Sequence, residues 1–446
     1  MYSVNPFAPQ DRRWHAEGNR ALNNHYDVIV AGGGSAGIAA AIGARRTGAR
    51  TLLIERGPCL GGAATLRSVV TYCGLHTRGR RQVVFGVAEE MLAGLRALDA
   101  VTEPTAFNAV AVVFDPEAVK RVADELCERA GVDVLLHSHI CAATREHDRV
   151  TAVQVADHSG FREFTAGAFV DSSGEADLAH QAGAEVRYGN DGWVLNGTLG
   201  VRFGGIPAHA PMTRAALSEA VRAAKESGAS DLTGHTGLVA RMPVSNDVIT
   251  YLADESYDAR SAADTSRAER SARRQAQAYL RVVKSLPGCA DAYIVSTGPE
   301  MGTRESRHLT GRAQLTEKDI LQPASATGCG TGDVAGYGTD YVAVGAWPIE
   351  SHPGPGLPVE WQYIPEPGYY GIPLDILWSR NTPNLFGAGR TVDGDRGAGA
   401  SLRVMGTAFA TGQAAGVAAA FTADQRGATA GAVRRELDRQ GAYLPD

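Results

Sequence analysis

The sequence predicts an α/β fold whose parallel sheet binds a nucleotide. Residues 26–31, Tyr-Asp-Val-Ile-Val-Ala, form an apolar run typical of a buried parallel strand. A glycine-rich turn at 32–37 follows, and an alanine-rich segment, 36–47, predicts a helix that ends at Gly48. A second apolar run at 51–54 predicts the next strand. This order of strand, turn, helix and strand is that of a Rossmann-like βαβ unit.

The turn contains the spacing G-x-G-x-x-G, from Gly32 through Gly34 to Gly37. In such a unit the first glycine permits the tight turn, the second lets the backbone approach a pyrophosphate, and the third allows close packing of helix on strand. The start of the helix, at Ser35 and Ala36, offers free N–H groups and the positive end of the helix dipole to the phosphates. We therefore expect a dinucleotide here rather than a glycine turn without a ligand.

The second strand ends at Glu55, where an acidic side chain accepts hydrogen bonds from the ribose hydroxyls of adenosine. Arg56 follows, and a short loop leads to Gly61, Gly62 and Ala63. A glycine pair in this place resembles flavoproteins in which the chain turns back toward the flavin. We expect all five residues to contact the cofactor.

Two later segments favour FAD over NAD, because an NAD dehydrogenase needs neither of them. Residues 167–177 resemble the second nucleotide-contacting strand of the flavoproteins with two dinucleotide-binding domains, and residues 384–390 resemble their C-terminal flavin segment. A helix at about 403–420 follows, whose first N–H groups are expected to face the pyrimidine end of the flavin. The expected cofactor contacts in these segments are Ser172, Gly174, Gly389, Arg390, Arg403 and Gly412.

From residue 26 onward the chain resembles the bacterial FAD-dependent oxidoreductases related to fumarate reductase flavoproteins and to the A subunit of heterodisulfide reductase. The resemblance rests on the order of several short segments: 74–76, 265–269, 302–307, 347–352 and 369–373. It implies a FAD-binding domain of the glutathione-reductase type, assembled from both ends of the chain around an inserted α+β substrate domain. We expect a tail at 1–25, the first FAD part at 26–180, the substrate-binding insert at 181–345 and the second FAD part at 346–446.

Other flavoprotein classes fit the sequence less well. The Gly-Asp-Ala-Ala-His run of class A monooxygenases and the Trp-x-Trp-x-Ile-Pro run of flavin halogenases are absent, and Gly389-Arg390-Thr391 stands in place of the former. Cys59 has no nearby partner of the disulfide-reductase kind, and no second complete βαβ unit for NAD(P)H is predicted. Electrons are therefore expected to leave to oxygen or to a separate acceptor.

For the chemistry itself we expect His352 to act as the base, with Glu350 beside it. In an extended chain residues i and i+2 share a face, so the carboxylate can orient the imidazole. The alternative is a histidine that merely caps a loop before Pro353. Arg304 is expected to hold an anionic group or stabilise reduced flavin, although an Arg–Glu network with Glu305 and Arg307 is an equal alternative.

Three further side chains are weaker candidates. His76 follows the glycine-pair loop and is expected either to contact flavin or substrate, to carry a covalent flavin link, or to be a polar loop residue. Tyr370 is a candidate pocket residue whose default is the core. Cys73 is a candidate nucleophile, although a buried structural cysteine is more common. The glycine-rich segment 328–338 is a candidate lid.

The composition of the chain limits the kinds of partner that the protein is expected to bind. The net charge of −6 argues against nucleic acid, and no stretch is long and apolar enough to cross a membrane. No metal-ligand spacing occurs, and the six cysteines show no disulfide framework, so we expect a cytoplasmic protein with reduced thiols and a possible homodimer.

Three interpretations of function remain open. The favoured one is a FAD-dependent dehydrogenase or oxidase that removes two electrons from a small molecule at a C–N, C–O or C–C bond. A flavin reductase fed by a partner electron carrier is the second. A non-catalytic redox sensor that binds flavin is the third.

Overall fold

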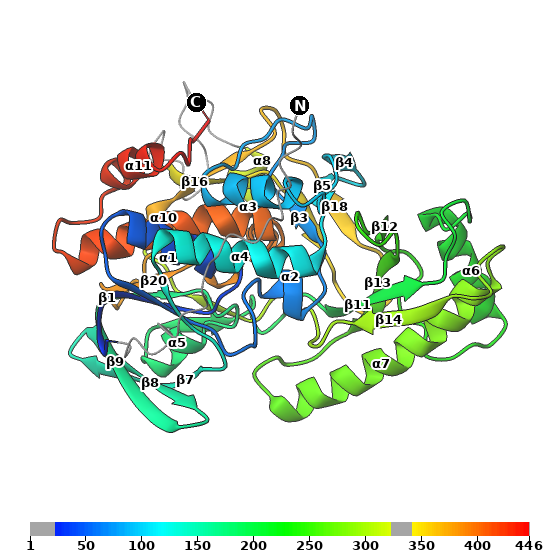
Figure 1. Cartoon of the computed structure of the whole chain (residues 1–446), viewed down its shortest axis with the longest axis horizontal. Coiled ribbons are helices and arrows are strands. Elements are labelled where there is room, and N and C mark those ends of the chain that lie inside the picture. Colours follow the sequence, from blue (N-terminus) through cyan, green and yellow to red (C-terminus); the bar gives the residue numbers. More distant parts are fainter. Residues whose placement is uncertain (1–22, 323–340, 446) are drawn as a thin grey trace, which may run out of the picture.

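A computed structural model describes residues 23–322 and 341–445, and its largest sheet has a parallel core. Figure 1 shows this sheet in the larger part of the molecule, with a smaller part extending to one side. The parallel strands are, in spatial order, β6 (Asp133–Leu135), β2 (Thr51–Ile54), β1 (His25–Ala31), β9 (Gly160–Asp171) and β20 (Leu385–Gly387). The α/β class expected from the sequence is confirmed.

Side chains of β1 alternate between two cores because successive residues of a strand point to opposite faces. Val28 and Val30 pack into the cluster that holds α1 (Ser35–Arg46) and α10 (Met405–Ala423). Ile29, on the other face, packs with the antiparallel strands β7 and β8 and with α5. These last three elements are His139–Glu146, Arg149–Asp157 and Asp177–Gln181. The strand at the centre of the nucleotide-binding unit is thus buried on both faces.

The smaller part is an antiparallel sheet with two helices on one face. Its strands are, in spatial order, β12 (Val239–Arg241), β13 (Val248–Glu255), β11 (Gly197–Gly204) and β14 (Tyr293–Thr297). Helices α6 (Arg214–Glu226) and α7 (Ala262–Ser285) pack on it through a separate apolar core and are visible in green in Figure 1. The strand expected at 198–203 and the charged helix expected at 264–285 are both present. The domain boundaries themselves stay a prediction.

The remaining helices and strands pack around or between these two parts. They are α2 (Ala63–Leu66), β3 (Thr71–Cys73), α3 (Val87–Arg96), β4 (Thr105–Ala106), β5 (Val110–Val113), α4 (Pro116–Ala130), β10 (Val186–Tyr188), β15 (Arg307–Leu309), α8 (Glu317–Leu321), β16 (Tyr341–Gly345), β17 (Ile349–Ser351), β18 (Glu360–Gln362), β19 (Tyr370–Pro373), α9 (Arg396–Leu402) and α11 (Ala430–Arg439). Asp115 caps α4 by accepting hydrogen bonds from the N–H groups of Glu117 and Ala118, with Pro116 in the first turn.

Some expectations concern residues outside the described ranges. The expected lid, 328–338, and most of the expected tail lie there, while residues 23–25 already lead into β1. In the part of the chain that is described, no single helix is long and apolar enough to cross a membrane. Helices α9 and α10 together pass that test of length and composition, but the chain bends by 92° between them.

Candidate functional site

A cavity of about 710 Å³ lies between the parallel sheet and the antiparallel sheet. One end is formed by the loops that follow β1, β2, β9 and β20, at the carboxyl ends of the parallel strands. The other end is formed by residues of the antiparallel sheet together with the segments 107–111 and 347–361. In open α/β sheets, ligands bind at this edge.

The glycine loop after β1 leaves space for a ligand at one position only. A Cβ atom on Gly32 would lie 2.6 Å from the carbonyl oxygen of Ser172, and one on Gly37 would lie 1.8 Å from the carbonyl oxygen of Gly32. A Cβ atom on Gly34 would meet only the Cα of Gly62, at 3.7 Å, and Gly34 lines the cavity. Gly32 and Gly37 are therefore required for close packing, whereas the bare backbone at Gly34 forms a cradle open to the cavity.

The cradle continues into the N-terminus of α1. Gly34 is the N-cap residue and supplies no side-chain cap, while Ser35 and Ala36 line the cavity. The first N–H groups of a helix have no intrahelical acceptor, so they are available to a phosphate. The side-chain hydroxyl of Ser172, in the segment after β9, donates to the carbonyl oxygens of Ala31 and Gly32 and so holds the start of the glycine loop in place.

Glu55 is buried beside this cradle and its two carboxylate oxygens are already ordered. Oε2 accepts from the N–H of Gly33 at 2.6 Å, and Oε1 accepts from the N–H of Gly57 at 2.7 Å. Each oxygen of a carboxylate has a second acceptor position. Glu55 lines the cavity and can therefore accept two ribose hydroxyls while it holds the loop.

The expected glycine pair folds back onto the first loop. Gly61 donates its N–H to the carbonyl oxygen of Gly33 at 2.9 Å, and Gly62 has a φ of 55°. A Cβ atom on Gly62 would lie 2.7 Å from the Cα of Gly34. Gly62 and Ala63 line the cavity, whereas Gly61 contributes by joining the two loops.

A group of charged side chains borders the same end of the cavity; Arg67, Glu175 and Arg390 are largely buried, whereas Arg56 and Glu300 are more exposed. Arg390 lies 2.9 Å from Glu175, which also pairs with Arg67 at 3.3 Å, and Arg67 and Arg56 both approach Glu300. Burial alone would raise the pKa of the Glu175 carboxyl, but Arg390 and Arg67 outweigh it and hold that pKa below its usual range. One nitrogen of Arg390, Nη1, is buried without a partner among the described residues. An anionic ligand in the cavity would satisfy it.

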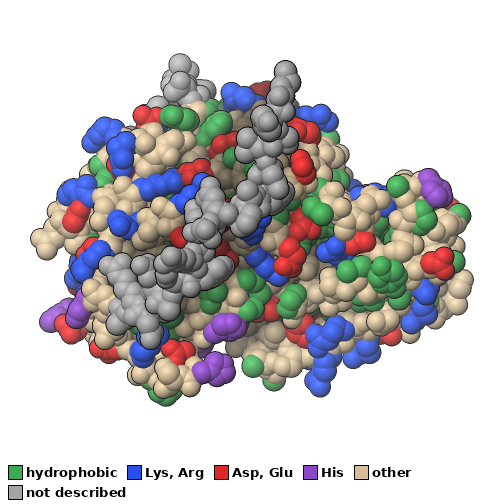
Figure 2. Space-filling model, in the orientation of Figure 1, with side chains coloured by type: hydrophobic (Ala, Val, Ile, Leu, Met, Phe, Trp, Pro, Cys, Tyr) green, Lys and Arg blue, Asp and Glu red, His purple; other side chains and the backbone are tan. Residues whose placement is uncertain are grey.

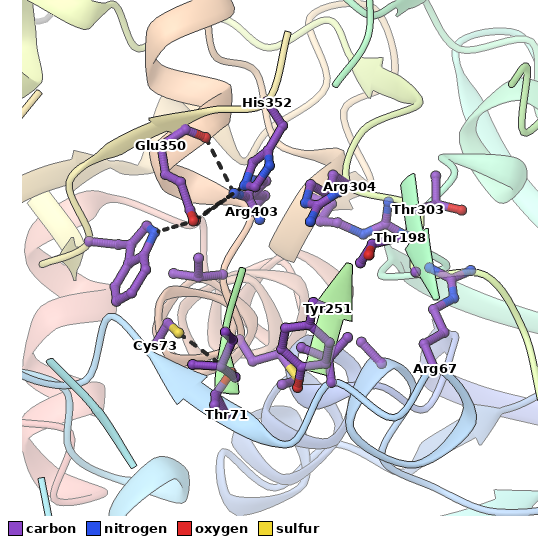
Figure 3. A pocket seen from close by; sticks show the side chains of 18 of the residues that line it. Arg67, Thr71, Cys73, Thr198, Tyr251, Thr303, Arg304, Glu350, His352 and Arg403 are labelled. Carbon is purple, nitrogen blue, oxygen red and sulfur yellow. Dashed lines mark hydrogen bonds and ion pairs between the residues drawn. The ribbon is translucent and has the colours of Figure 1, made fainter. Parts of the chain in front are cut away.

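The opposite wall holds the predicted base. Nε2 of His352 lies 3.2 Å from Oε1 of Glu350, and Oε2 of Glu350 accepts from Arg403 at 2.7 Å and from the indole N–H of Trp347 at 3.0 Å. Arg304 lies close by and donates to the carbonyl oxygen of Asn196. Figure 3 shows Glu350, His352, Arg403 and Arg304 gathered on one side of the cavity.

The protonation states in this group follow from burial and from the two arginines. Burial and the charge of Arg304 lower the pKa of His352 to about 4, so the imidazole is neutral at pH 7. Burial opposes ionisation of Glu350, but the hydrogen bond with His352 and the charge of Arg403 outweigh it and keep the pKa of its carboxyl below the usual range. A neutral imidazole held by a carboxylate can accept a proton.

Comparison with known proteins agrees with this geometry. The family model described as "FAD dependent oxidoreductase" matches residues 27–439. The chain belongs to this family. FAD is therefore its cofactor, and the protein is a FAD-dependent oxidoreductase, an enzyme that requires a substrate and an electron acceptor. No curated protein matches the chain at a significant level.

Solved structures with a similar fold are distant from this oxidoreductase. A geranylgeranyl bacteriochlorophyll reductase-like protein from Thermoplasma acidophilum is 12% identical, with 94% of this chain and 84% of that chain covered and a TM-score of 0.44. For the myxobacterial chondrochloren halogenase the identity is 17%, the coverages are 93% and 79%, and the TM-score is 0.40. The anhydrotetracycline hydroxylase of Streptomyces rimosus is 13% identical, with 93% of this chain and 68% of that chain covered and a TM-score of 0.44. This likeness carries no argument about the reaction.

The residues around the cavity fit FAD. The cradle at Gly34 and the start of α1 suit its pyrophosphate, and Glu55 suits its adenosine ribose. The start of α10 lies at the cavity, with Val404 as an N-cap that supplies no side-chain bond and with Met405 and Ala408 in the lining. Its free N–H groups suit the pyrimidine end of the flavin. Bound FAD supplies the capacity to accept two electrons as a hydride equivalent.

Most predicted site residues meet at this cavity. In addition to those discussed above, Gly174 and Gly389 line it. Sequence reasoning missed Arg67, Glu175 and Glu300, which pair with one another and with Arg56 and Arg390 across segments far apart in the sequence. Trp347 belongs to a segment quoted for the family resemblance, but its bond to Glu350 was not foreseen.

Five predicted site residues lie outside the cavity lining: Gly37 and Gly61, whose packing roles are described above, and His76, Tyr370 and Gly412. His76 is buried outside the lining, and burial and Arg96 of α3 lower its pKa. Tyr370 is a core residue whose hydroxyl bonds Ser401 at 2.7 Å. A Cβ atom on Gly412 would lie 2.1 Å from the carbonyl oxygen of Ala36, so this glycine lets α10 pack against α1.

The surroundings of Cys73 and Glu305 favour structural roles for these two residues. Cys73 lines the cavity, but burial and the charge of Glu350 raise the pKa of its thiol to about 12, which opposes a nucleophilic role. Glu305 accepts from the N–H of Leu195 and from His308, so it belongs to a buried network. The ion pairs of Arg304 and Arg307 are with Asp254 and Asp177 instead, so this network is not the Arg–Glu network expected as the alternative. No group of metal-ligating side chains occurs in residues 23–322 and 341–445.

Proposed function

We propose that this oxidoreductase removes two electrons from a small-molecule substrate at a C–N, C–O or C–C bond, as a dehydrogenase or oxidase. The substrate loses a hydride equivalent to FAD and a proton to His352. The observation that carries the proposal is the position of the His352 imidazole, 3.2 Å from the carboxylate of Glu350, at a cavity that also contains the nucleotide cradle.

Each nearby side chain has a defined task in this proposal. Glu350 is a positioning residue: it orients the imidazole and stabilises the imidazolium that forms when the proton arrives. Arg403 and the indole N–H of Trp347 hold Glu350 in place. Because Arg304 disfavours the imidazolium, a negative charge that arrives beside Arg304 raises the proton affinity of His352 when the substrate binds.

The reduced enzyme then passes its electrons to oxygen or to a separate acceptor, since the sequence predicts no NAD(P)H unit. We also propose a kinship with fumarate reductase flavoproteins, a cytoplasmic location and a homodimer. Acidic and basic side chains are interspersed over the face drawn in Figure 2, a pattern that does not favour nucleic acid as a partner.

The test is anaerobic bleaching of the visible absorbance band of the flavin by a library of small metabolites. A compound that bleaches the wild type is then used with His352→Gln, in which flavin reduction slows roughly 10²- to 10⁴-fold. His209→Gln, at an exposed histidine outside the cavity lining, is the control and keeps the wild-type rate.

The same experiment separates the other interpretations. Equal reduction rates in the wild type and His352→Gln would contradict the proposal. Reduction by a reduced electron carrier, with no metabolite active, would favour the flavin reductase. Flavin that neither metabolites nor carriers reduce catalytically would favour the redox sensor.

A further inference from the structure

The half of the cavity that faces away from the FAD cradle has an apolar wall. Trp347 and Trp361 pack edge to face, with ring centroids 6.0 Å apart, and form a cluster with Ala109 and Val404. Val404 precedes α10, so this cluster begins where the flavin ring system is expected. The apolar wall is therefore continuous with the flavin end of the cavity.

The wall continues outward on three separate segments. Phe107 lies on the turn between β4 and β5, Leu238 lies just before β12, and Leu357 lies on the loop between β17 and β18. Phe107 is 37% exposed and Leu357 is 58% exposed, although both line the cavity. Large apolar side chains exposed together at the mouth of a cavity mark a surface that a ligand covers. We call Phe107, Leu238, Leu357, Trp347 and Trp361 the apolar slot.

The inner end of the slot is cationic. Nη1 of Arg304 donates to the carbonyl oxygen of Asn196 at 2.7 Å and lies 3.8 Å from the nearest carboxylate, that of Asp254. The side chain of Arg304 is only 12% exposed, and the structure shows no hydrogen bond from its other N–H groups to any described residue. Arg403, by contrast, is paired with Glu350 at 2.7 Å. Arg304 thus presents donors that a planar oxyanion can accept in pairs.

We propose that the substrate is an organic monocarboxylate with an apolar or aromatic body, whose carboxylate binds Arg304 and whose body lies in the apolar slot. This inference rests on the proposed function, because it names the substrate class of the same site. It selects against small dicarboxylates, since the second carboxylate would lie against Trp361, Leu238 and Phe107 and lose its hydration. It selects against neutral molecules because the donors of Arg304 would stay unpaired.

The test measures binding to the FAD-loaded enzyme by titration calorimetry, with three small probes that differ in charge and in apolar body. Phenylacetate carries both features, 2-phenylethanol lacks the charge, and succinate carries a second carboxylate and no ring. We expect phenylacetate to bind at least roughly tenfold more tightly than either of the others. If succinate binds as tightly as phenylacetate, the apolar slot does not select the substrate. If 2-phenylethanol binds as tightly as phenylacetate, Arg304 does not bind the carboxylate. If phenylacetate gives no heat of binding at millimolar concentration, both parts of the proposal fail.

Variants assign the two features to residues. In Arg304→Gln, phenylacetate is expected to fall to the affinity of 2-phenylethanol, while 2-phenylethanol itself is unchanged. In the double variant Phe107→Ala, Leu357→Ala, both aromatic probes weaken by the same factor. Arg121→Gln removes one exposed arginine of α4 outside the cavity and is expected to leave all affinities within about twofold. A loss of the same size in Arg121→Gln would mean that net charge, not Arg304, binds the anion.

Binding and bleaching fail independently. If phenylacetate binds as expected but no aromatic or aliphatic monocarboxylate reduces the flavin, the cavity still selects monocarboxylates, but the proposed oxidation is wrong. If a metabolite without a carboxylate bleaches the flavin through His352, the oxidation stands and this inference fails. The comparison of the three probes on the wild type needs no variant, so a variant that misfolds does not remove the test.

Discussion

Gly34→Ala separates FAD binding from folding. The backbone at Gly34 has φ −74° and ψ −175°, which an alanine adopts without strain, and its Cβ atom would meet only the Cα of Gly62, at 3.7 Å. Exchanging glycine for alanine at a compatible position restricts the unfolded chain and stabilises the fold by about 0.4–1 kcal/mol. We therefore expect the apoprotein of the variant to be as stable as the wild type or slightly more stable.

The same methyl group stands in the cradle where the pyrophosphate approaches the start of α1. It keeps the phosphate oxygens from the N–H groups there, and each lost hydrogen bond to a charged group costs about 1.5–3 kcal/mol. One or two such bonds correspond to a rise in the Kd of FAD of at least roughly tenfold, since about 1.4 kcal/mol is a factor of ten. Two opposite changes, in stability and in affinity, are therefore expected from a single methyl group.

The assay titrates FAD into the flavin-free protein and follows the quenching of flavin fluorescence, with urea unfolding measured alongside. Gly431→Ala is the matched control, because its Cβ atom would meet only a nitrogen of Arg435, at 3.6 Å, on the surface helix α11. Gly37→Ala is the opposite control: its Cβ atom would collide with the backbone, so folding itself should fail. A Kd for Gly34→Ala within twofold of the wild type would refute the placement of the pyrophosphate on this loop.

Three further expectations follow from the packing and the pKa shifts. Gly412→Ala places a methyl group 2.1 Å from the carbonyl oxygen of Ala36. Urea unfolding should therefore show a free energy of unfolding about 1–3 kcal/mol lower than that of the wild type. A loss below about 0.5 kcal/mol, the size typical of surface changes, would contradict the tight contact. The pKa of His352 is about 4 in the folded protein and 6.5 in the unfolded chain, so the unfolded chain takes up the proton first as the pH falls. The free energy of unfolding should therefore drop between pH 6.5 and pH 4, by up to about 3 kcal/mol. His352→Gln should flatten that part of the pH profile, and an unchanged profile would count against a buried neutral imidazole. With a pKa of about 12, Cys73 should react with iodoacetamide at pH 8 roughly a thousandfold more slowly than a free thiol in peptide mapping by mass spectrometry; rapid labelling would restore it as a candidate nucleophile.

The sequence predicted best those features that depend on backbone conformation within a few residues. The roles of Gly32, Gly34 and Gly37 follow from how close a chain can approach itself or a ligand, and these limits are local. Glu55 was predictable for a similar reason, because the length of the βαβ unit fixes where the second strand ends. The pairing of Glu350 with His352 followed from the alternation of side chains along an extended segment.

Features that depend on contacts between distant segments escaped prediction. His76 and Tyr370 were candidates by position in the sequence, but packing turns one toward α3 and the other toward Ser401. Arg390 was expected to contact the cofactor, yet nothing in the sequence indicated that Glu175 would neutralise it. Gly412 illustrates the same limit, since a helical glycine can serve a ligand or a neighbouring helix, and only the position of Ala36 decides.

The contact between α1 and α10 has a consequence for how this enzyme acquires its cofactor during synthesis. Gly412 and Gly416 let α10 lie directly on the backbone of α1, and β20 joins the parallel sheet next to β9. A ribosome must therefore translate the cradle, the whole antiparallel sheet and most of the remaining chain before the last wall of the cavity exists. The cavity that receives FAD is thus complete only when nearly the whole chain has been made.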